Sequence, residues 1–313
     1  MSDTKIANLN ETDSSIRPKE NLFVETVKNL LRNNSARAGL VILSFLLFIF
    51  LFAPVLAPYE PNQILLDRPN GIIPRLPPCL ELFGCTDGPQ FVMGLDGNGR
   101  DIYSRVLYGS RLSLPVGLAA VSISIVIGTL IGLVAGFYGG WVDNIIMRFM
   151  DVLLAFPSLL LAIAIVTVLG PGLINALIAI SIVAIPTYAR LIRSGVLTLK
   201  EQEFVLAERA LGASNRRIMF GQILPNSLTP IVVQGTLGIG TAVLDAAALS
   251  FLGLGAQPPA SEWGRMLGDA IDFFRAAPHM AIFPGVAIML TVLGFNLLGD
   301  GLRDALDPRL NRN

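Results

Sequence analysis

Six apolar segments dominate the chain, and each is close to the length of about 20 residues with which a helix crosses a lipid bilayer. Apolar residues make up 53% of the chain and charged residues only 15%, whereas soluble domains carry about 25% charged residues. A backbone in lipid must satisfy its own hydrogen bonds, which favours helices. The sequence therefore predicts an all-α integral membrane protein with six transmembrane helices, at 38–56, 112–137, 152–169, 173–189, 228–249 and 280–298.

The polar ends of the chain are expected to lie outside the bilayer. Residues 1–37 form an N-terminal tail, in which apolar side chains at helical spacing predict an amphipathic helix at 21–32 on the membrane lipid. No short apolar core precedes a small-residue cleavage site, so we expect no removable signal peptide. Residues 57–111 form a loop rich in Pro and Gly, and residues 302–313 form a C-terminal tail.

The remaining helices form a five-helix core at 112–301. Residues 138–144 are expected to form a short turn, and Pro157 is expected to kink the third transmembrane helix because it cannot donate a backbone hydrogen bond. A polar loop at 193–226 separates the fourth and fifth helices, and a second polar loop at 253–279 separates the fifth and sixth.

Lysine and arginine placement orients the helices, because these residues accumulate on the cytoplasmic side. With both termini in the cytoplasm, 16 of the 23 basic residues lie inside and 7 outside. The opposite orientation would reverse that ratio. The sequence therefore predicts cytoplasmic termini, a cytoplasmic loop at 193–226 and an extracytoplasmic loop at 57–111.

The central polar segment, residues 201–226, has a specific internal pattern, EQEFVLAERALGASNRRIMFGQILPN. A helix is expected to end near Leu211, with Gly212 in a left-handed conformation. Ser214 is expected to cap a second short helix, and Leu224 and Pro225 close the segment. Loops that only tether helices do not need this design, so the pattern indicates a docking surface.

This segment resembles the cytoplasmic coupling loop, the EAA loop, of permease subunits of ATP-binding-cassette (ABC) importers, above all the C-type subunits that serve dipeptides, oligopeptides and nickel. The family pattern is E-A-A, three residues, Gly, about nine residues and I-L-P. Leu206 replaces the first Glu and Gln222 replaces a common His. The resemblance covers 93–307 and includes DGNGRD at 96–101, which we interpret as a turn before an interfacial helix. The matching residues of the loop are Ala207, Gly212, Ile223, Leu224 and Pro225.

The resemblance implies the type I importer architecture in a bacterial or archaeal plasma membrane. It also implies a second permease subunit in a heterodimer, two ATPase subunits and an extracytoplasmic substrate-binding protein. ATP and Mg²⁺ would be bound by the partner ATPases, and this chain would bind no cofactor. The residues implied to couple this chain to the ATPases are Ala207, Glu208, Gly212, Ala213, Ser214, Asn215, Arg216, Leu224 and Pro225.

The residues needed for ATP hydrolysis or metal binding are missing from the sequence. A P-loop requires Gly-Lys followed by Ser or Thr, and none of the four lysines follows a glycine. The single histidine, His279, cannot form a histidine metal site, so we expect neither a metal site nor an enzyme. The formal net charge is zero, which gives no indication of nucleic-acid binding.

Asp245 is the one acidic residue within the six apolar segments, and ionisable groups in such segments are candidates for function. A contact with substrate on the translocation path and a local, water-facing position are both open readings. Cys79 and Cys85 lie together in the loop predicted to be extracytoplasmic, where disulfides persist, so we expect a bond between them.

Four classes of function compete for this chain. A secondary transporter would carry paired ionisable residues at mid-membrane, and only Asp245 is available. A channel would need a filter motif, and a membrane enzyme would need reactive residues. The sequence favours a permease subunit of an ABC importer for dipeptides or oligopeptides, with nickel or another small solute as the alternative substrate.

Overall fold

The computed structural model describes residues 28–67, 71–79 and 90–306. Within these ranges the chain is helical and its only strand-like pairing is three isolated β-bridges. Residues 21–27 of the predicted amphipathic helix at 21–32 lie outside the described residues, and residues 28–32 are helical. The long helices are α2 (Asn34–Leu56), α3 (Ile102–Tyr138), α4 (Gly140–Leu154), α5 (Ser158–Leu169), α6 (Leu173–Leu199), α10 (Leu228–Phe251) and α12 (His279–Leu306).

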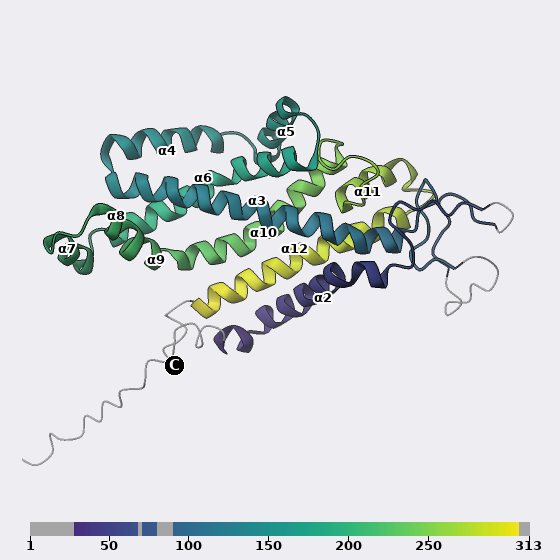
Figure 1. The fold of residues 1–313 in the computed structure, drawn as a ribbon, viewed down its shortest axis with the longest axis horizontal. Helices are drawn as coiled ribbons and strands as arrows, with labels where there is room; N and C mark the ends of the chain where they lie inside the picture. The colour runs from purple at the N-terminus through teal and green to yellow at the C-terminus, as the bar shows by residue number, and fades with distance from the viewer. Residues whose placement is uncertain (1–27, 68–70, 80–89, 307–313) are drawn as a thin grey trace, which may run out of the picture.

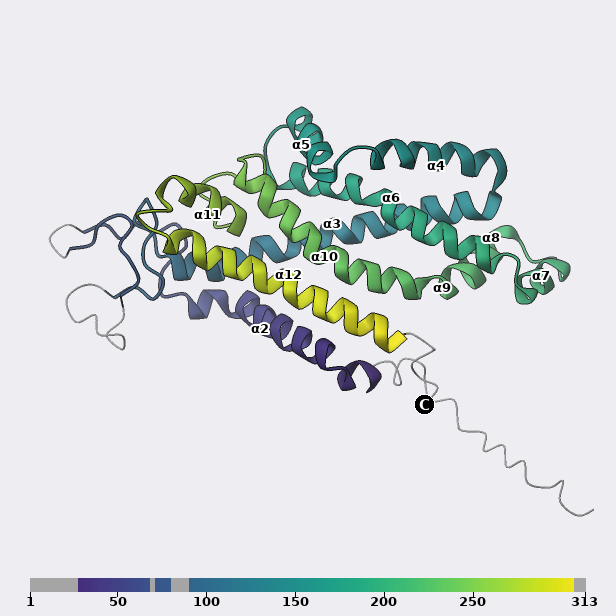
Figure 2. The same cartoon turned by 180° about the vertical axis from the view of Figure 1, so that it is seen from behind.

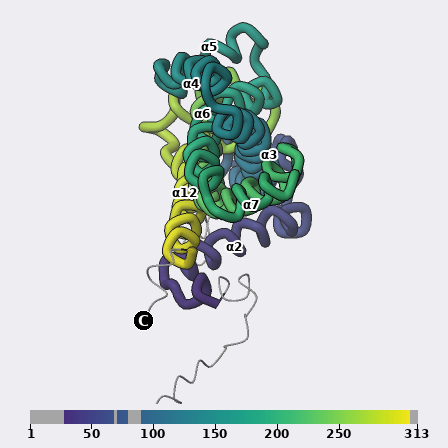
Figure 3. The backbone as a smooth tube through the Cα atoms, turned by 90° about the vertical axis from the view of Figure 1, so that its left-hand side faces the viewer, coloured from purple at the N-terminus to yellow at the C-terminus, as the bar shows by residue number. Residues whose placement is uncertain are grey.

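The long helices form an elongated bundle (Figure 1). The described loop residues 57–67, 71–79 and 90–101 and the short helix α11 (Trp263–Ala270) lie at one end of it. The start of α2, the end of α12 and the segment after α6 lie at the other end. Seen from behind, α12 lies between α10 and α2 (Figure 2). An end-on view places α4 and α5 on one side of the bundle and α2 on the opposite side (Figure 3).

Five of the described helices are long and apolar enough to cross a membrane, and α4 with α5 would be a sixth if this bent pair is one span. The prediction of several apolar helices is therefore confirmed, but the predicted third helix at 152–169 is wrong. Gly139 and Gly140, with φ +65° and +57°, make the turn after α3, and α4 begins at Gly140. The chain then bends by 92° before α5, because Pro157 precedes the first residue of α5 and cannot continue the α4 hydrogen bonds.

Three other predicted helices are too short. The α3 helix begins at Ile102 and not at 112, and α12 continues to Leu306, into the predicted C-terminal tail. The α6 helix runs through both of its arginines to Leu199, so the polar loop begins at Lys200 and not at 193. The length of an apolar run indicates which residues can lie in lipid, but a helix continues into polar residues until its backbone is capped.

The α3 and α6 helices form the most extensive helix pair of the bundle. Gly128, Gly132 and Gly136 recur every fourth residue of α3 and face α6. A Cβ atom at Gly128 would lie 2.8 Å from the Ile185 carbonyl oxygen, and one at Gly136 would lie 2.8 Å from the Val196 Cβ. Small residues at this spacing let two membrane helices approach closely, which is how α3 and α6 associate without a water-driven hydrophobic force.

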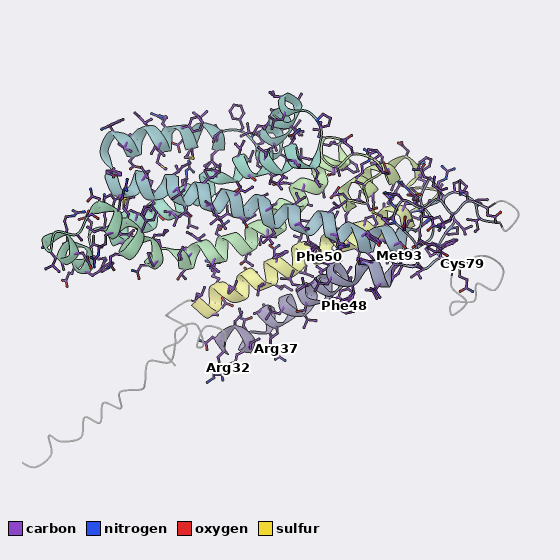
Figure 4. All side chains as sticks on the ribbon, in the orientation of Figure 1. Arg32, Arg37, Phe48, Phe50, Cys79 and Met93 are labelled. Atoms are coloured by element: carbon purple, nitrogen blue, oxygen red, sulfur yellow. The ribbon has the colours of Figure 1, made fainter. Side chains whose placement is uncertain are left out.

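The α2 helix packs mainly against α12 and leaves its other face exposed. Phe48, for example, is 47% exposed, and Figure 4 labels it together with Phe50. A helix that is apolar on its exposed face suits lipid contact. The large exposed side chains of α2 are Val41, Phe45, Leu47, Phe48, Leu51, Phe52 and Val55.

A buried arginine holds the loops at the end opposite the segment after α6. Arg105 is 1% exposed and donates hydrogen bonds to the carbonyl oxygens of Pro61 (3.0 Å) and Ala260 (3.2 Å). Asp96 lies 3.6 Å from Arg105 and 2.7 Å from Arg100. Asp101 caps α3, as the predicted turn and helix at this position require.

Glu262 and Trp263 position α11 against α3. The buried Glu262 carboxylate accepts hydrogen bonds from the Ser113 hydroxyl (3.1 Å) and from the Arg265 backbone N–H (2.8 Å). The Trp263 indole donates to the Val106 carbonyl oxygen at 2.9 Å. His279 has a structural contact here, since its Nε2 lies 3.2 Å from the Leu95 carbonyl oxygen.

Candidate coupling site

The segment from Lys200 to Asn226, here called the coupling segment, follows α6 directly and begins with the helix α7 (Glu203–Ala210). Two hydrogen bonds close α7: the Ala213 N–H donates to the Glu208 carbonyl oxygen, and the Gly212 N–H donates to the Arg209 carbonyl oxygen, each at 3.0 Å. This pair of bonds defines a Schellman motif. Gly212 has φ +81°, so the predicted left-handed helix end is confirmed.

A second short helix follows, and Ser214 caps it as predicted. Its hydroxyl accepts a hydrogen bond from the Arg217 N–H at 3.4 Å, which starts α8 (Asn215–Arg217). One turn of π-helix (Ile218–Ile223) comes next, and then α9 (Leu224–Asn226). The π-turn was not predicted. Because a π-helix bonds residues five apart, it places Ile218 and Ile223 on one face, and both are fully buried.

The coupling segment is anchored to the ends of α3 and α6 by a continuous apolar cluster. Val205 of α7 belongs to it and is fully buried. This anchoring fixes the segment to α3 and α6, because each fully buried aliphatic side chain contributes about 1.5–3 kcal/mol relative to exposure. The buried members of the cluster are Leu133, Ile192, Val196, Val205, Ile218, Met219, Ile223 and Ile231.

Glu208 connects the two halves of the coupling segment. Its carboxylate accepts a hydrogen bond from the Gln222 side-chain amide at 3.1 Å and lies 3.8 Å from the Arg217 guanidinium. A side chain in α7 is thereby tied to the π-turn. In the sequence, Gln222 is noted only because it replaces the family's common His. The hydrogen bond between Gln222 and Glu208 was not predicted.

The outer face of the coupling segment combines apolar and basic side chains. Leu211 is 86% exposed and Leu206 is 47% exposed, and Arg216 is exposed as well. Leucines in an otherwise polar segment are the sequence signal for this face, but the predicted coupling residues do not include Leu206 or Leu211. Of the predicted coupling residues, those exposed are Ala207, Gly212, Ser214, Asn215, Arg216 and Pro225, and those half-buried are Glu208, Ala213 and Leu224.

Two ion pairs join α4 to α6 above the coupling segment. The Arg193 guanidinium forms a two-pronged pair with the buried Asp143 carboxylate, at 2.5 and 2.6 Å. Arg190 lies 2.5 Å from Asp151, and both of these side chains are about half exposed. The α6 helix therefore connects the coupling segment to α4 through charged contacts as well as to α3 through glycine packing.

The predicted translocation residue, Asp245, lies apart from the coupling segment. It lines a cavity of about 130 Å³ between α3, α6 and α10, together with polar side chains that include Tyr188 and Gln234. Cys79 is disulfide-bonded, and its predicted partner, Cys85, lies outside the described residues. The Cys79–Cys85 pairing stays a prediction.

Comparison with known proteins identifies two family matches. Residues 128–312 match the family described as the binding-protein-dependent transport system inner membrane component. Residues 21–78 match the N-terminal transmembrane domain of oligopeptide transport permease C. The first match includes the coupling segment and the α6 and α10 sides of the cavity.

Individual relatives are similar over most of their length. The dipeptide transport system permease protein DppC of Alkalihalophilus pseudofirmus is 51% identical, over 91% of this chain and 90% of that protein. The di/tripeptide transport system permease protein DppC of Pseudomonas aeruginosa is 48% identical, over 89% of each. The glutathione transport system permease protein GsiD of Escherichia coli O157:H7 is 49% identical, over 89% of this chain and 88% of that protein. This chain, a multi-pass membrane protein, therefore belongs to the family of inner membrane components of binding-protein-dependent transport systems.

Proposed function

We propose that this chain is the C-type permease subunit of an ATP-driven importer of dipeptides and other short peptides. The observation that carries the proposal is the 46–51% identity, over nearly the whole chain, to permeases named for dipeptides, di- and tripeptides and glutathione. The match to the N-terminal domain of oligopeptide transport permease C supports the same substrate class.

The partners follow from this function. A second permease subunit forms the translocation path with this chain as a heterodimer, and an extracytoplasmic binding protein delivers the peptide. Two ATPase subunits bind ATP and Mg²⁺ and supply the energy, while this chain binds neither and hydrolyses nothing by itself. The architecture is that of type I importers in a bacterial or archaeal plasma membrane.

The ATPases dock on the outer face of the coupling segment. The exposed Leu206 and Leu211 provide apolar contacts, and the exposed Arg216 is available for charge pairing. Interfaces between proteins combine apolar and polar contacts, and the exposed side chains of this segment offer both. The internal Glu208–Gln222 bond supports the docking role, because it stiffens the face that must transmit a force.

Both termini lie in the cytoplasm in this proposal. The excess of basic residues predicted on that side supports it, as does the common end at which the start of α2, the end of α12 and the coupling segment lie (Figure 1). ATP binding closes the ATPases, the coupling segment moves with them, and the helices open toward the outside. Hydrolysis then returns the path to the inward-facing state.

The test is uptake of labelled dialanine into liposomes that contain this chain with its cognate permease and ATPase subunits. Uptake should require internal ATP and external binding protein. Uptake driven by a proton gradient without the ATPases would identify a secondary transporter. A cognate binding protein that binds Ni²⁺ and no dipeptide would establish the nickel alternative.

A further inference from the structure

One face of α10 carries polar residues in the middle of an otherwise apolar helix. Gln234, Gly238, Thr241 and Asp245 follow at spacings of four, three and four residues. That spacing places all of them on one side of an α-helix. At a rise of 1.5 Å per residue the stripe extends over about 16 Å of the helix. It spans much of the bilayer's apolar thickness of about 30 Å.

This stripe forms one wall of the cavity between α3, α6 and α10. Gly238 makes room for the opposite wall, because the Tyr188 hydroxyl lies where a Cβ at that position would be. Thr187 of α6 and Thr241 of α10 are exposed, so the cavity opens to the surface between them. Its volume of about 130 Å³ is too small for a whole dipeptide but admits a single polar end group with water.

The polar side chains of this cavity have no partner among the described residues. Several threonines of the long helices bond back to their own helix, as Thr167, Thr236 and Thr291 do at 2.8 Å. Thr187 and Thr241 make no such bond, and no described residue donates to the Asp245 carboxylate. The hydrogen-bonding capacity of the cavity is therefore available to a ligand.

Charge makes Asp245 the strongest of these groups. A carboxylate within a membrane helix is costly unless it is paired or solvated. The two arginines of α6 cannot serve it without breaking other pairs, because Arg190 pairs with Asp151 and Arg193 with Asp143. The site therefore selects a small cation that carries several hydrogen-bond donors. The protonated amino terminus of a peptide has that chemistry, with three N–H donors on one positive charge.

We propose that this cavity binds the α-ammonium group of a peptide during its passage, with the Asp245 carboxylate as the charge partner and the Thr241 hydroxyl beside it. The inference rests on the proposed function as a peptide importer. It adds a recognition site within the membrane helices, independent of the selection made by the binding protein.

The first test compares variants of the reconstituted complex with unchanged binding protein. Asp245→Asn keeps the shape of the side chain and removes its charge, so uptake of dialanine per ATP hydrolysed should fall about 10- to 100-fold, the range for losing one charged hydrogen bond. Asp245→Glu should retain most of the uptake. Thr236→Val is the matched control, because Thr236 lies on the same helix but bonds to the Val232 carbonyl oxygen and does not line the cavity.

The second test detects occupancy directly and needs no binding protein. With Thr241→Cys in the complex in lipid nanodiscs, dialanine should slow labelling by a small thiol reagent, and N-acetyl-dialanine, which has no ammonium group, should not. Adding Asp245→Asn should abolish the protection. Absent protection, or equal protection by the two compounds, overturns the proposal.

Other outcomes separate this inference from the function on which it rests. Normal uptake per ATP by Asp245→Asn overturns the ammonium site but leaves the importer function intact. Loss of the second permease from both Asp245 variants on purification assigns the carboxylate to subunit pairing and overturns the site. A wild-type complex that imports no peptide refutes the proposed function itself.

Discussion

Gly212 is the position of the coupling segment at which a single substitution gives the clearest prediction. Its φ of +81° lies in the left-handed region, where an L-residue with a Cβ is disfavoured by about 1–2 kcal/mol. A Cβ built at Gly212 meets no atom within 4 Å, so the whole penalty comes from the backbone and none from a clash inside this chain. Valine is β-branched, so Gly212→Val should raise the free energy of the left-handed turn by at least this amount.

The magnitude decides what the turn does. Each of the two hydrogen bonds that close α7 contributes a net 0.5–1.5 kcal/mol or so. A penalty of about 1–2 kcal/mol is therefore comparable to the bonds that hold the turn, and it shifts the equilibrium between closed and open turns by a factor of about 5–30. The membrane helices are unaffected, because Val205, Ile218 and Ile223 anchor the coupling segment independently of the turn.

The assay is peptide uptake and binding-protein-stimulated ATP hydrolysis in reconstituted complexes, normalised to the ATPase subunit that co-purifies. Gly212→Val should insert normally, and both activities should fall together. Gly212→Asn is the matched control, because asparagine tolerates the left-handed conformation. Normal activity per complex for Gly212→Val would refute the placement of the coupling site. Equal losses for both variants would show that side-chain bulk at the partner interface matters, and not backbone strain.

Three further predictions concern orientation, the disulfide and the α4–α6 contact. A reporter that is active only outside the cell should be active when fused after Gln63 or Trp263 and inactive after Arg217, and an active Arg217 fusion would reverse the proposed orientation. A membrane-impermeant maleimide should label Cys79 and Cys85 only after reduction, since the bond closes a short loop and contributes about 2–3 kcal/mol; equal labelling before and after reduction would exclude the bond. Arg193→Ala should lower the free energy of unfolding by about 1–3 kcal/mol, because it leaves the buried Asp143 carboxylate unpaired. Arg190→Ala should lower it less, because the Arg190–Asp151 pair is half exposed. Thermal unfolding in detergent compares the two variants, and equal shifts in unfolding temperature would contradict the role of burial.

Local patterns in the sequence predicted the parts of the fold that depend on neighbouring residues alone. Apolar length was enough to find the helices, and the spacing of Gly212 and Ser214 was enough to find the turn between α7 and α8. Both features are set by residues that are close in the sequence. A helix in lipid forms because its backbone must satisfy its own hydrogen bonds, and the turn forms because adjacent residues cap the helix ends.

Features that depend on distant residues were missed or misjudged. Arg105 was placed in the predicted loop at 57–111, but it lies in α3, and carbonyl groups from two separate loops accept its hydrogen bonds. Pro157 was expected to kink one helix, and the 92° bend instead separates two. The stripe at Gln234, Gly238, Thr241 and Asp245 was visible as a four-three-four spacing, but the opposing wall from α6 was needed to identify it as the lining of a cavity.

The α6 helix connects the coupling segment with the proposed ammonium site. Its residues Ile180, Ala184, Thr187 and Tyr188 line the cavity, and its last turn leads into the coupling segment. Glycine packing against α3 leaves little room for the two helices to slide past each other, since a shift would bring backbone atoms into contact. A displacement of α7 therefore moves α3 and α6 as one unit. The α10 helix follows the coupling segment directly and contributes Ile231 to its apolar cluster, so the wall of the cavity that carries Asp245 is connected to the coupling segment as well.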